Sequence, residues 1–166
     1  MDFLATARRQ MLAGQVNDAR ERLLASFDDL AAEDMLEPGV KGNWSVRDVL
    51  NNIVAWDRIT AECFRAMLAG ERHALLDMDE ESVARFEQES YEAGKDKMVV
   101  EAIQELHSSR EELLDLLRDV SNEQMFAPAP GDEAADMSIA ACLTVTVNMD
   151  EESAEAIERW REAHEK

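Results

Sequence analysis

Residues 42–57 read GNWSVRDVLNNIVAWD and contain the clearest helix start in the chain. The Ser45 hydroxyl is placed to accept a hydrogen bond from the backbone N–H of Asp48, and the Asp48 carboxylate to accept one from the N–H of Ser45. A carboxylate in the first turn also favours the positive end of the helix dipole. Apolar residues then recur at helical spacing to about Ala69, with Gly70 as a stop, so the stretch predicts a long amphipathic helix.

Three other long segments show similar spacing, at residues 3–30, 98–120 and 138–164. In the first of them, the side chains predicted to share the inward face are Leu4, Met11, Val16, Ala19, Leu23, Phe27 and Leu30. The last segment is less regular, because Leu143, Val145 and Val147 alternate as in a strand. We still predict a helix there, since a lone strand would have no partner. Its predicted inward face carries Val145, Met149, Ser153, Ile157 and Trp160.

Shorter signals lie between these segments. Asp79 is a helix cap for a short helix that Gly94 ends, and Ser121 begins another capping pattern. Proline and glycine mark loops at residues 37–42 and 127–131. The pattern predicts an all-α fold: a four-helix bundle with a short extra helix between helices 2 and 3, in a single domain over residues 1–166.

The 166 residues include 17 basic and 37 acidic side chains, which give a formal charge of −20. This acidic chain repels phosphate backbones and anionic headgroups, so we expect no nucleic-acid and no membrane partner. No apolar run approaches the ~20 residues that span a bilayer, and the N-terminal charges follow a short apolar patch, the reverse of a secretion signal. We interpret the protein as cytoplasmic, with Cys63 and Cys142 as buried reduced thiols.

Four blocks of sequence, in order, carry a resemblance to a known family: LEPGV at residues 36–40, GNWSVRDVL at 42–50, Trp56-Asp57, and IERW at 157–160. The chain resembles the DinB-like four-helix bundles, and within them the ClbS/DfsB (DUF1706-type) branch. The resemblance implies a bundle that is often a homodimer. In many members one histidine of the second helix and two of the last helix hold a divalent metal for thiol-dependent transfer or isomerisation. Members of the ClbS type are linked to hydrolytic resistance against a genotoxic small molecule, without the same dependence on a metal.

The three histidine positions of that family fall on Asn52, Met149 and Ser153 in this chain. Amide, thioether and hydroxyl groups are weak, uncharged donors for zinc, nickel or iron, so we predict a degenerate metal site with no metal and no cofactor. One alternative stays open: a carboxylate site for a non-standard metal, built from Asp48, Asp150 and Glu152. The other interpretation of Asp150 and Glu152 is a solvated acidic face.

The resemblance and the helical spacing together place a candidate ligand site between the second and last helices. Its predicted ligand-binding residues are Asn52, Trp56, Met149, Ser153 and Asp48, and no catalytic residue is assigned. We expect a metal-free bundle that binds a small molecule, with or without modifying it chemically. The alternatives are a non-enzymatic homodimeric structural or interaction bundle in which these residues only fill the core, and a ClbS-like hydrolase or metal-dependent thiol transferase.

Overall fold

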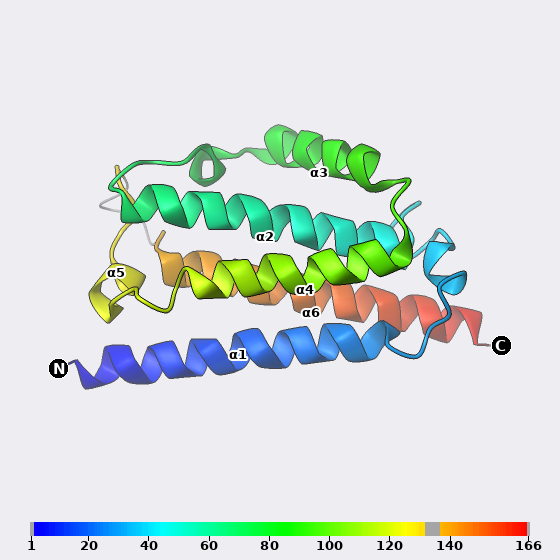
Figure 1. Cartoon of the computed structure of the whole chain (residues 1–166), viewed down its shortest axis with the longest axis horizontal. Helices are drawn as coiled ribbons and strands as arrows, with labels where there is room; N and C mark the ends of the chain where they lie inside the picture. The colour runs from blue at the N-terminus through cyan, green and yellow to red at the C-terminus, as the bar shows by residue number, and fades with distance from the viewer. Residues whose placement is uncertain (1, 132–136, 166) are drawn as a thin grey trace.

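The computed structural model describes residues 2–131 and 137–165, and over these ranges it is helical, as predicted. Four long helices form the bundle (Figure 1): α1 (Phe3–Phe27), α2 (Val46–Leu68), α4 (Val99–Asp115) and α6 (Ile139–His164). None of the helices within the described ranges has the length and hydropathy to span a bilayer.

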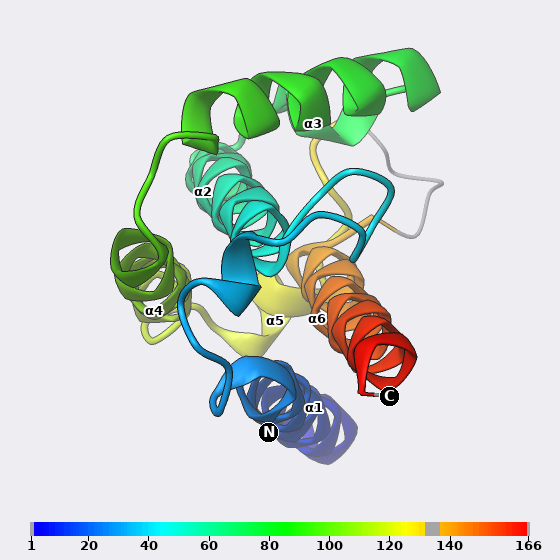
Figure 2. The same ribbon diagram turned by 90° about the vertical axis from the view of Figure 1, so that its right-hand side faces the viewer.

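The long helices run in two directions. α1 and α6 lie side by side and run the same way, while α2 and α4 run the opposite way (Figures 1 and 2). The connection from α2 to α4 must therefore return along the full bundle. It does so through the short turn η2 (Ala74–Asp77) and the extra helix α3 (Glu80–Gly94), which lies along the outer side of α2. The remaining elements are η1 (Asp34–Leu36) and α5 (Asn122–Phe126).

The predicted helix caps are present. The backbone N–H of Ser45 donates to the Asp48 carboxylate at 2.9 Å, and the N–H of Asp48 donates to the Ser45 hydroxyl at 3.3 Å. Asp79 caps α3 by accepting from the N–H of Ser82, and Ser121 caps α5. α2 ends beside Gly70, whose φ of 77° favours glycine.

The structure corrects parts of the predicted inward faces. Leu4 and Met11 of α1 are exposed, at 76% and 66%, and Val145 of α6 is 57% exposed. The buried face of α6 instead passes through Thr146 and Asp150, and Asp150 is fully buried, so it is not part of a solvated acidic face. The α4 helix also ends earlier than predicted, at Asp115, and turns carry the chain on to α5.

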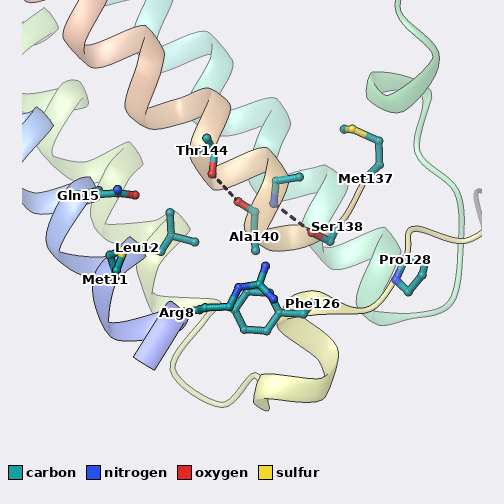
Figure 3. A pocket seen from close by; sticks show the side chains of 11 residues that line it. Arg8, Met11, Leu12, Gln15, Phe126, Pro128, Met137, Ser138, Ala140 and Thr144 are labelled. Carbon is teal, nitrogen blue, oxygen red and sulfur yellow. Dashed lines mark hydrogen bonds between the residues drawn. The ribbon is translucent and has the colours of Figure 1, made fainter. Parts of the chain in front are cut away.

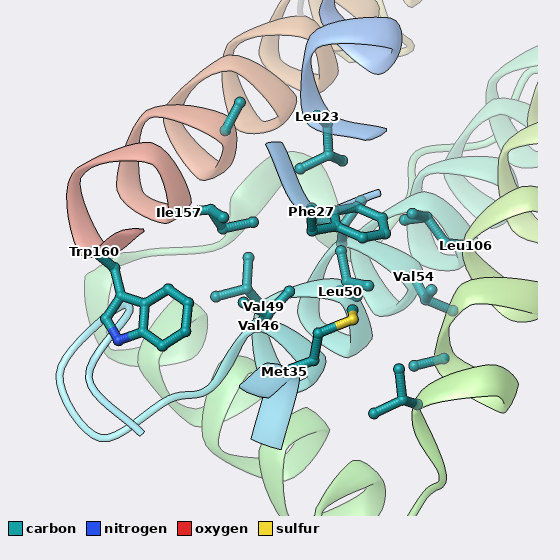
Figure 4. Packing of buried hydrophobic residues seen from close by; sticks show 14 residues of the cluster. Leu23, Phe27, Met35, Val46, Val49, Leu50, Val54, Leu106, Ile157 and Trp160 are labelled. Carbon is teal, nitrogen blue, oxygen red and sulfur yellow. The ribbon is translucent and has the colours of Figure 1, made fainter. Parts of the chain in front are cut away.

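The hydrophobic core consists of two main clusters, one toward each end of the bundle. One cluster joins the C-terminal halves of α1 and α6 to the N-terminal halves of α2 and α4, around Leu23, Leu50, Leu106 and Ile157 (Figure 4). The other joins the opposite halves of the same helices, around Leu12, Phe64, Leu113 and Leu143. Between them, each of the four long helices contributes one buried charged residue.

Candidate functional site

Four buried charged residues form a closed layer across the bundle: Arg20 from α1, Asp57 from α2, Arg110 from α4 and Asp150 from α6. Arg110 donates to Asp57 at 3.1 and 3.2 Å and to Asp150 at 3.0 and 3.3 Å. Arg20 donates to Asp150 at 3.0 and 3.3 Å and to Asp57 at 3.4 Å. Ser109 adds a hydroxyl donor to Asp57, also at 3.4 Å. Two guanidinium and two carboxylate groups leave this charged layer with no net charge.

Burial changes the acid–base properties of the charged layer. Burial raises the pKa of the Asp57 carboxyl, although the positive charges of Arg110 and Arg20 act to lower it. Burial acts to lower the pKa of Arg110, but the neighbouring charges of Asp57 and Asp150 outweigh it, so this pKa is raised. Asp57 therefore depends on its two arginines to remain ionised.

A cavity of about 240 Å³ lies against this charged layer. Its walls come from α2, α4 and α6 and include Asp57 and Arg110, while residues 75–83 of the α2–α4 connection form its roof. Its lining residues are Trp56, Asp57, Thr60, Leu75, Leu76, Met78, Val83, Arg110, Met137, Cys142, Val145, Thr146 and Met149. Most of the lining is apolar, and the polar groups lie on the bundle helices rather than on the roof.

The structure brings together two of the five predicted ligand-binding residues. Trp56 and Met149 both line the cavity. Asn52 is buried one turn before Trp56, and its Oδ1 has no hydrogen-bond partner among the described residues. Ser153 is half-buried and Asp48 is occupied as a helix cap, and neither lines the cavity.

The side chains at the family's metal position do not fit a transition metal. Asn52, Met149 and Ser153 supply only neutral donors, of which the unpartnered Asn52 oxygen is the strongest. Of the alternative carboxylate set, Asp150 is held by two arginines and Asp48 by the start of α2, while Glu152 is exposed. Over the described residues, no group of three or more His, Cys, Asp or Glu side chains is arranged to hold a metal ion.

The two cysteines are buried free thiols. The Cys63 thiol of α2 donates to the Met67 sulfur at 3.8 Å, and the neighbouring Cys142 of α6 lowers the pKa of Cys63, while Cys63 raises the pKa of Cys142. Burial raises the pKa of Cys142 further. Because Cys142 is the one that lines the cavity, the thiol presented there is protonated at neutral pH and is a poor nucleophile.

A larger hollow of about 500 Å³ lies at one end of the bundle, between α1, α5 and α6 (Figure 3). Arg8 lies over the Phe126 ring there, with 4.3 Å between the guanidinium carbon and the ring centroid. Met11, on its edge, is mostly exposed, and none of the predicted site residues lines it. We place the candidate site in the smaller cavity, because buried charge and predicted residues come together there.

The sequence reasoning missed the charged layer, although a signal for it exists. Arg20 lies four residues after Val16 and three before Leu23, within the apolar stripe of α1. Arg110 has the same spacing to Leu106 and Leu113 in α4. A charged residue at such a position faces the core, where it needs a partner of opposite charge.

Comparisons with known proteins agree with this architecture. The structure is similar to that of "Sibling Lethal Factor Precursor - DfsB", with a TM-score of 0.81 and 15% identity over 95% of this chain and 96% of that one. It is also similar to the colibactin self-resistance protein ClbS, solved in complex with a dsDNA, with a TM-score of 0.79 and 12% identity over 92% and 95% of the two chains.

A third similar structure is a protein from Streptococcus pneumoniae, with a TM-score of 0.78 and 12% identity over 91% of this chain and 88% of that one. Identities this low establish a common fold alone. No curated protein sequence matches the chain. The family model of the DinB superfamily matches residues 15–148, which include about half of α1, all of α2 to α5 and the first part of α6, and the chain therefore belongs to the DinB superfamily.

Proposed function

We propose that this protein binds a small molecule, without a metal ion, in the cavity lined by Trp56 and Met149. The observation that carries the proposal is the cavity of about 240 Å³ that lies between α2, α4 and α6 and borders the charged layer. An apolar cavity with a few convergent polar groups is the usual form of a small-molecule site. The volume is below the ~300–1,000 Å³ of sites for drug-sized ligands, which favours a smaller ligand.

Binding is better supported than catalysis. Hydrolysis or group transfer needs a free base or nucleophile of suitable pKa. Asp57 is held by two arginines and Ser109, and the Cys142 thiol has a raised pKa. The two carboxylates considered from the sequence, Asp48 and Glu152, respectively cap α2 and face solvent.

The test is a screen of neutral fragments of about ten heavy atoms by ligand-observed NMR, with the unmodified protein and two valine variants. Val83→Phe brings a larger side chain into the cavity from its roof. Val100→Phe makes the same change at a half-exposed position of α4 that does not line the cavity. The proposal expects fragments that bind the unmodified protein and Val100→Phe but not Val83→Phe. It is wrong if no fragment binds, or if binding is insensitive to Val83→Phe.

A second candidate function is a homodimeric interaction bundle. Three apolar side chains of α1, Phe3, Leu4 and Met11, are exposed by 84%, 76% and 66%. Exposed apolar groups favour association, whereas the formal charge of −20 opposes it. Sedimentation at low and high salt tests this candidate, which expects a dimer that salt strengthens. A monomer at both salt concentrations would exclude it.

Nucleic acid is not part of the proposed function. The ClbS structure contains a dsDNA, but binding of that kind depends on basic side chains that displace counterions. This chain has 17 basic against 37 acidic residues. We expect no change in the fluorescence anisotropy of a labelled duplex at 50 mM salt, and saturable binding there would contradict the expectation.

A further inference from the structure

Thr60 is a polar side chain in the cavity whose hydroxyl has no hydrogen-bond partner among the residues that the structure describes. The residue lines the cavity and is only 7% exposed. A buried hydroxyl is normally paired, because leaving it unpaired costs the free energy of its lost hydration. The Thr60 oxygen is not among the fully enclosed unpartnered atoms, so it is reached from the cavity, where a water molecule or a ligand can supply its partner.

Other threonines show that this arrangement is not a general property of helical threonine. Thr146, which lines the same cavity and is also 7% exposed, donates its hydroxyl to the backbone oxygen of Cys142 at 3.1 Å. Thr144 likewise donates to the backbone oxygen of Ala140 at 3.2 Å (Figure 3). Thr60 thus differs from Thr146 in leaving its hydroxyl available to a ligand.

Thr60 lies beside the charged layer. It follows Asp57 by one helical turn of α2, so the two side chains are neighbours on the helix surface. Arg110, which binds Asp57 at 3.1 Å, lines the same cavity. Its four bonds to the two aspartates leave one of its five N–H groups without a recorded acceptor in the described ranges. Thr60 and Arg110 therefore offer two neighbouring donors, and the Trp56 Nε1–H, buried without a partner among the described residues, is a further donor in the cavity lining.

The charged layer also limits the charge of the ligand. Its two positive and two negative groups already neutralise each other, so an ionised ligand would lose its hydration without gaining an opposite charge. The other end of the cavity is apolar, with Leu75, Leu76 and Val83 from the roof. A ligand that matches both ends has an apolar body and a neutral polar group that accepts hydrogen bonds.

We propose that the cavity binds neutral carbonyl compounds with an apolar body, and that the Thr60 hydroxyl, with Arg110 beside it, donates to the carbonyl oxygen. A carbonyl oxygen has two lone pairs and so can accept from both donors. This inference rests on the proposed function, since it names the ligand class of the same cavity.

The test uses three probes with the same phenyl group. They are 4-phenyl-2-butanone, butylbenzene, which has the same carbon skeleton without the oxygen, and 3-phenylpropanoate, which is an anion of nearly the same shape. Titration calorimetry with the unmodified protein is expected to rank the ketone above butylbenzene, with no binding of the anion. Equal or tighter binding of butylbenzene or of the anion would overturn the inference while leaving the proposed function intact.

Two threonine variants locate the effect. Thr60→Val removes the hydroxyl without changing the shape of the side chain. It is expected to lower the affinity for the ketone about fivefold, the contribution of one neutral hydrogen bond, and to leave the affinity for butylbenzene unchanged. Thr144→Val is the control and should leave the ketone affinity unchanged, because Thr144 does not line the cavity and its hydroxyl already donates to the backbone oxygen of Ala140. Equal loss in both variants, or no loss in Thr60→Val, overturns the role of Thr60. If neither the ketone nor butylbenzene binds the unmodified protein, the inference is wrong, while the fragment screen decides the proposed function separately.

Discussion

Arg110 on α4 holds Asp150 on α6 through both of its terminal nitrogens, with Nη1–Oδ2 at 3.0 Å and Nη2–Oδ1 at 3.3 Å. The same guanidinium also binds Asp57 on α2, and Arg20 closes the layer from α1. Buried ion pairs of this kind add little net stability, because the cost of removing charges from water offsets their attraction. Their effect is to fix how the four long helices align, because each helix must place its charged residue at the same level of the bundle.

Replacing Arg110 by methionine should destabilise the protein strongly. Arg110→Met leaves the carboxylates of Asp57 and Asp150 with one arginine, and breaking a buried ion pair costs about 3–5 kcal/mol. The measurement is the free energy of unfolding in urea at pH 7. Arg118→Met is the control, since Arg118 is exposed and pairs with Asp115 at the surface, and its effect on the free energy of unfolding should stay within about 0.5 kcal/mol. Similar values for the two variants would show that the charged layer is not essential to the fold.

The loss in Arg110→Met should shrink as the pH falls. Burial raises the pKa of Asp57, and the variant lacks the positive charge that opposes this most strongly, so its pKa rises further. A carboxyl whose pKa is higher in the folded than in the unfolded state binds its proton in the folded state first as the pH falls. Protonation therefore favours folding between neutral pH and the ordinary carboxyl pKa of about 3.9. Urea unfolding at pH 7 and pH 5 checks this. A difference from the unmodified protein that is constant or larger at pH 5 would contradict it.

The end of α3 depends on a glycine. A Cβ at Gly94 would lie 2.5 Å from Nδ2 of Asn51, the same atom that donates to the Gly94 backbone oxygen at 3.0 Å. Gly94→Ala should therefore destabilise the protein by about 1–3 kcal/mol through overpacking. Gly14→Ala, in α1, has open space around the new methyl group and should instead stabilise it by about 0.5–1 kcal/mol. Thermal unfolding of both variants tests this pair of predictions: the melting temperature should fall in Gly94→Ala and rise in Gly14→Ala.

Restoring histidines at the family's metal position should create metal binding. We expect Asn52→His, Met149→His and Ser153→His together to bind zinc, because three imidazoles with an open position form a usual zinc site. The unmodified protein, purified without a histidine tag, should contain no stoichiometric transition metal. Elemental analysis and zinc titration measure both. A folded triple variant that fails to bind zinc would show that these three positions do not converge.

The helices were predictable because their signals are local. The Ser45 and Asp48 capping pair lies within one turn, and apolar spacing marks each long helix. The inward faces were less predictable, because a charged residue is ordinarily assigned to the surface. The sequence leaves two interpretations of Asp150, a carboxylate metal site and a solvated acidic face, yet the residue is buried between two arginines from other helices.

The cavity could be predicted only in part. Trp56 and Met149 follow from their positions on two facing helices, and both line it. Its roof, with Leu75 and Leu76, comes from a segment whose apolar pattern is too sparse to reveal where it packs. The role of Thr60 depends on a hydroxyl that finds no partner within residues 2–131 and 137–165, which is a property of the folded structure and not of the sequence.

The most direct test is a crystal structure of the protein grown with 4-phenyl-2-butanone. The account predicts density for the ketone between α2, α6 and residues 75–83, with its oxygen within hydrogen-bond distance of the Thr60 hydroxyl and its phenyl group against Leu75 and Val83. A cavity without ligand at saturating ketone, or ketone density only in the hollow between α1, α5 and α6, would contradict it.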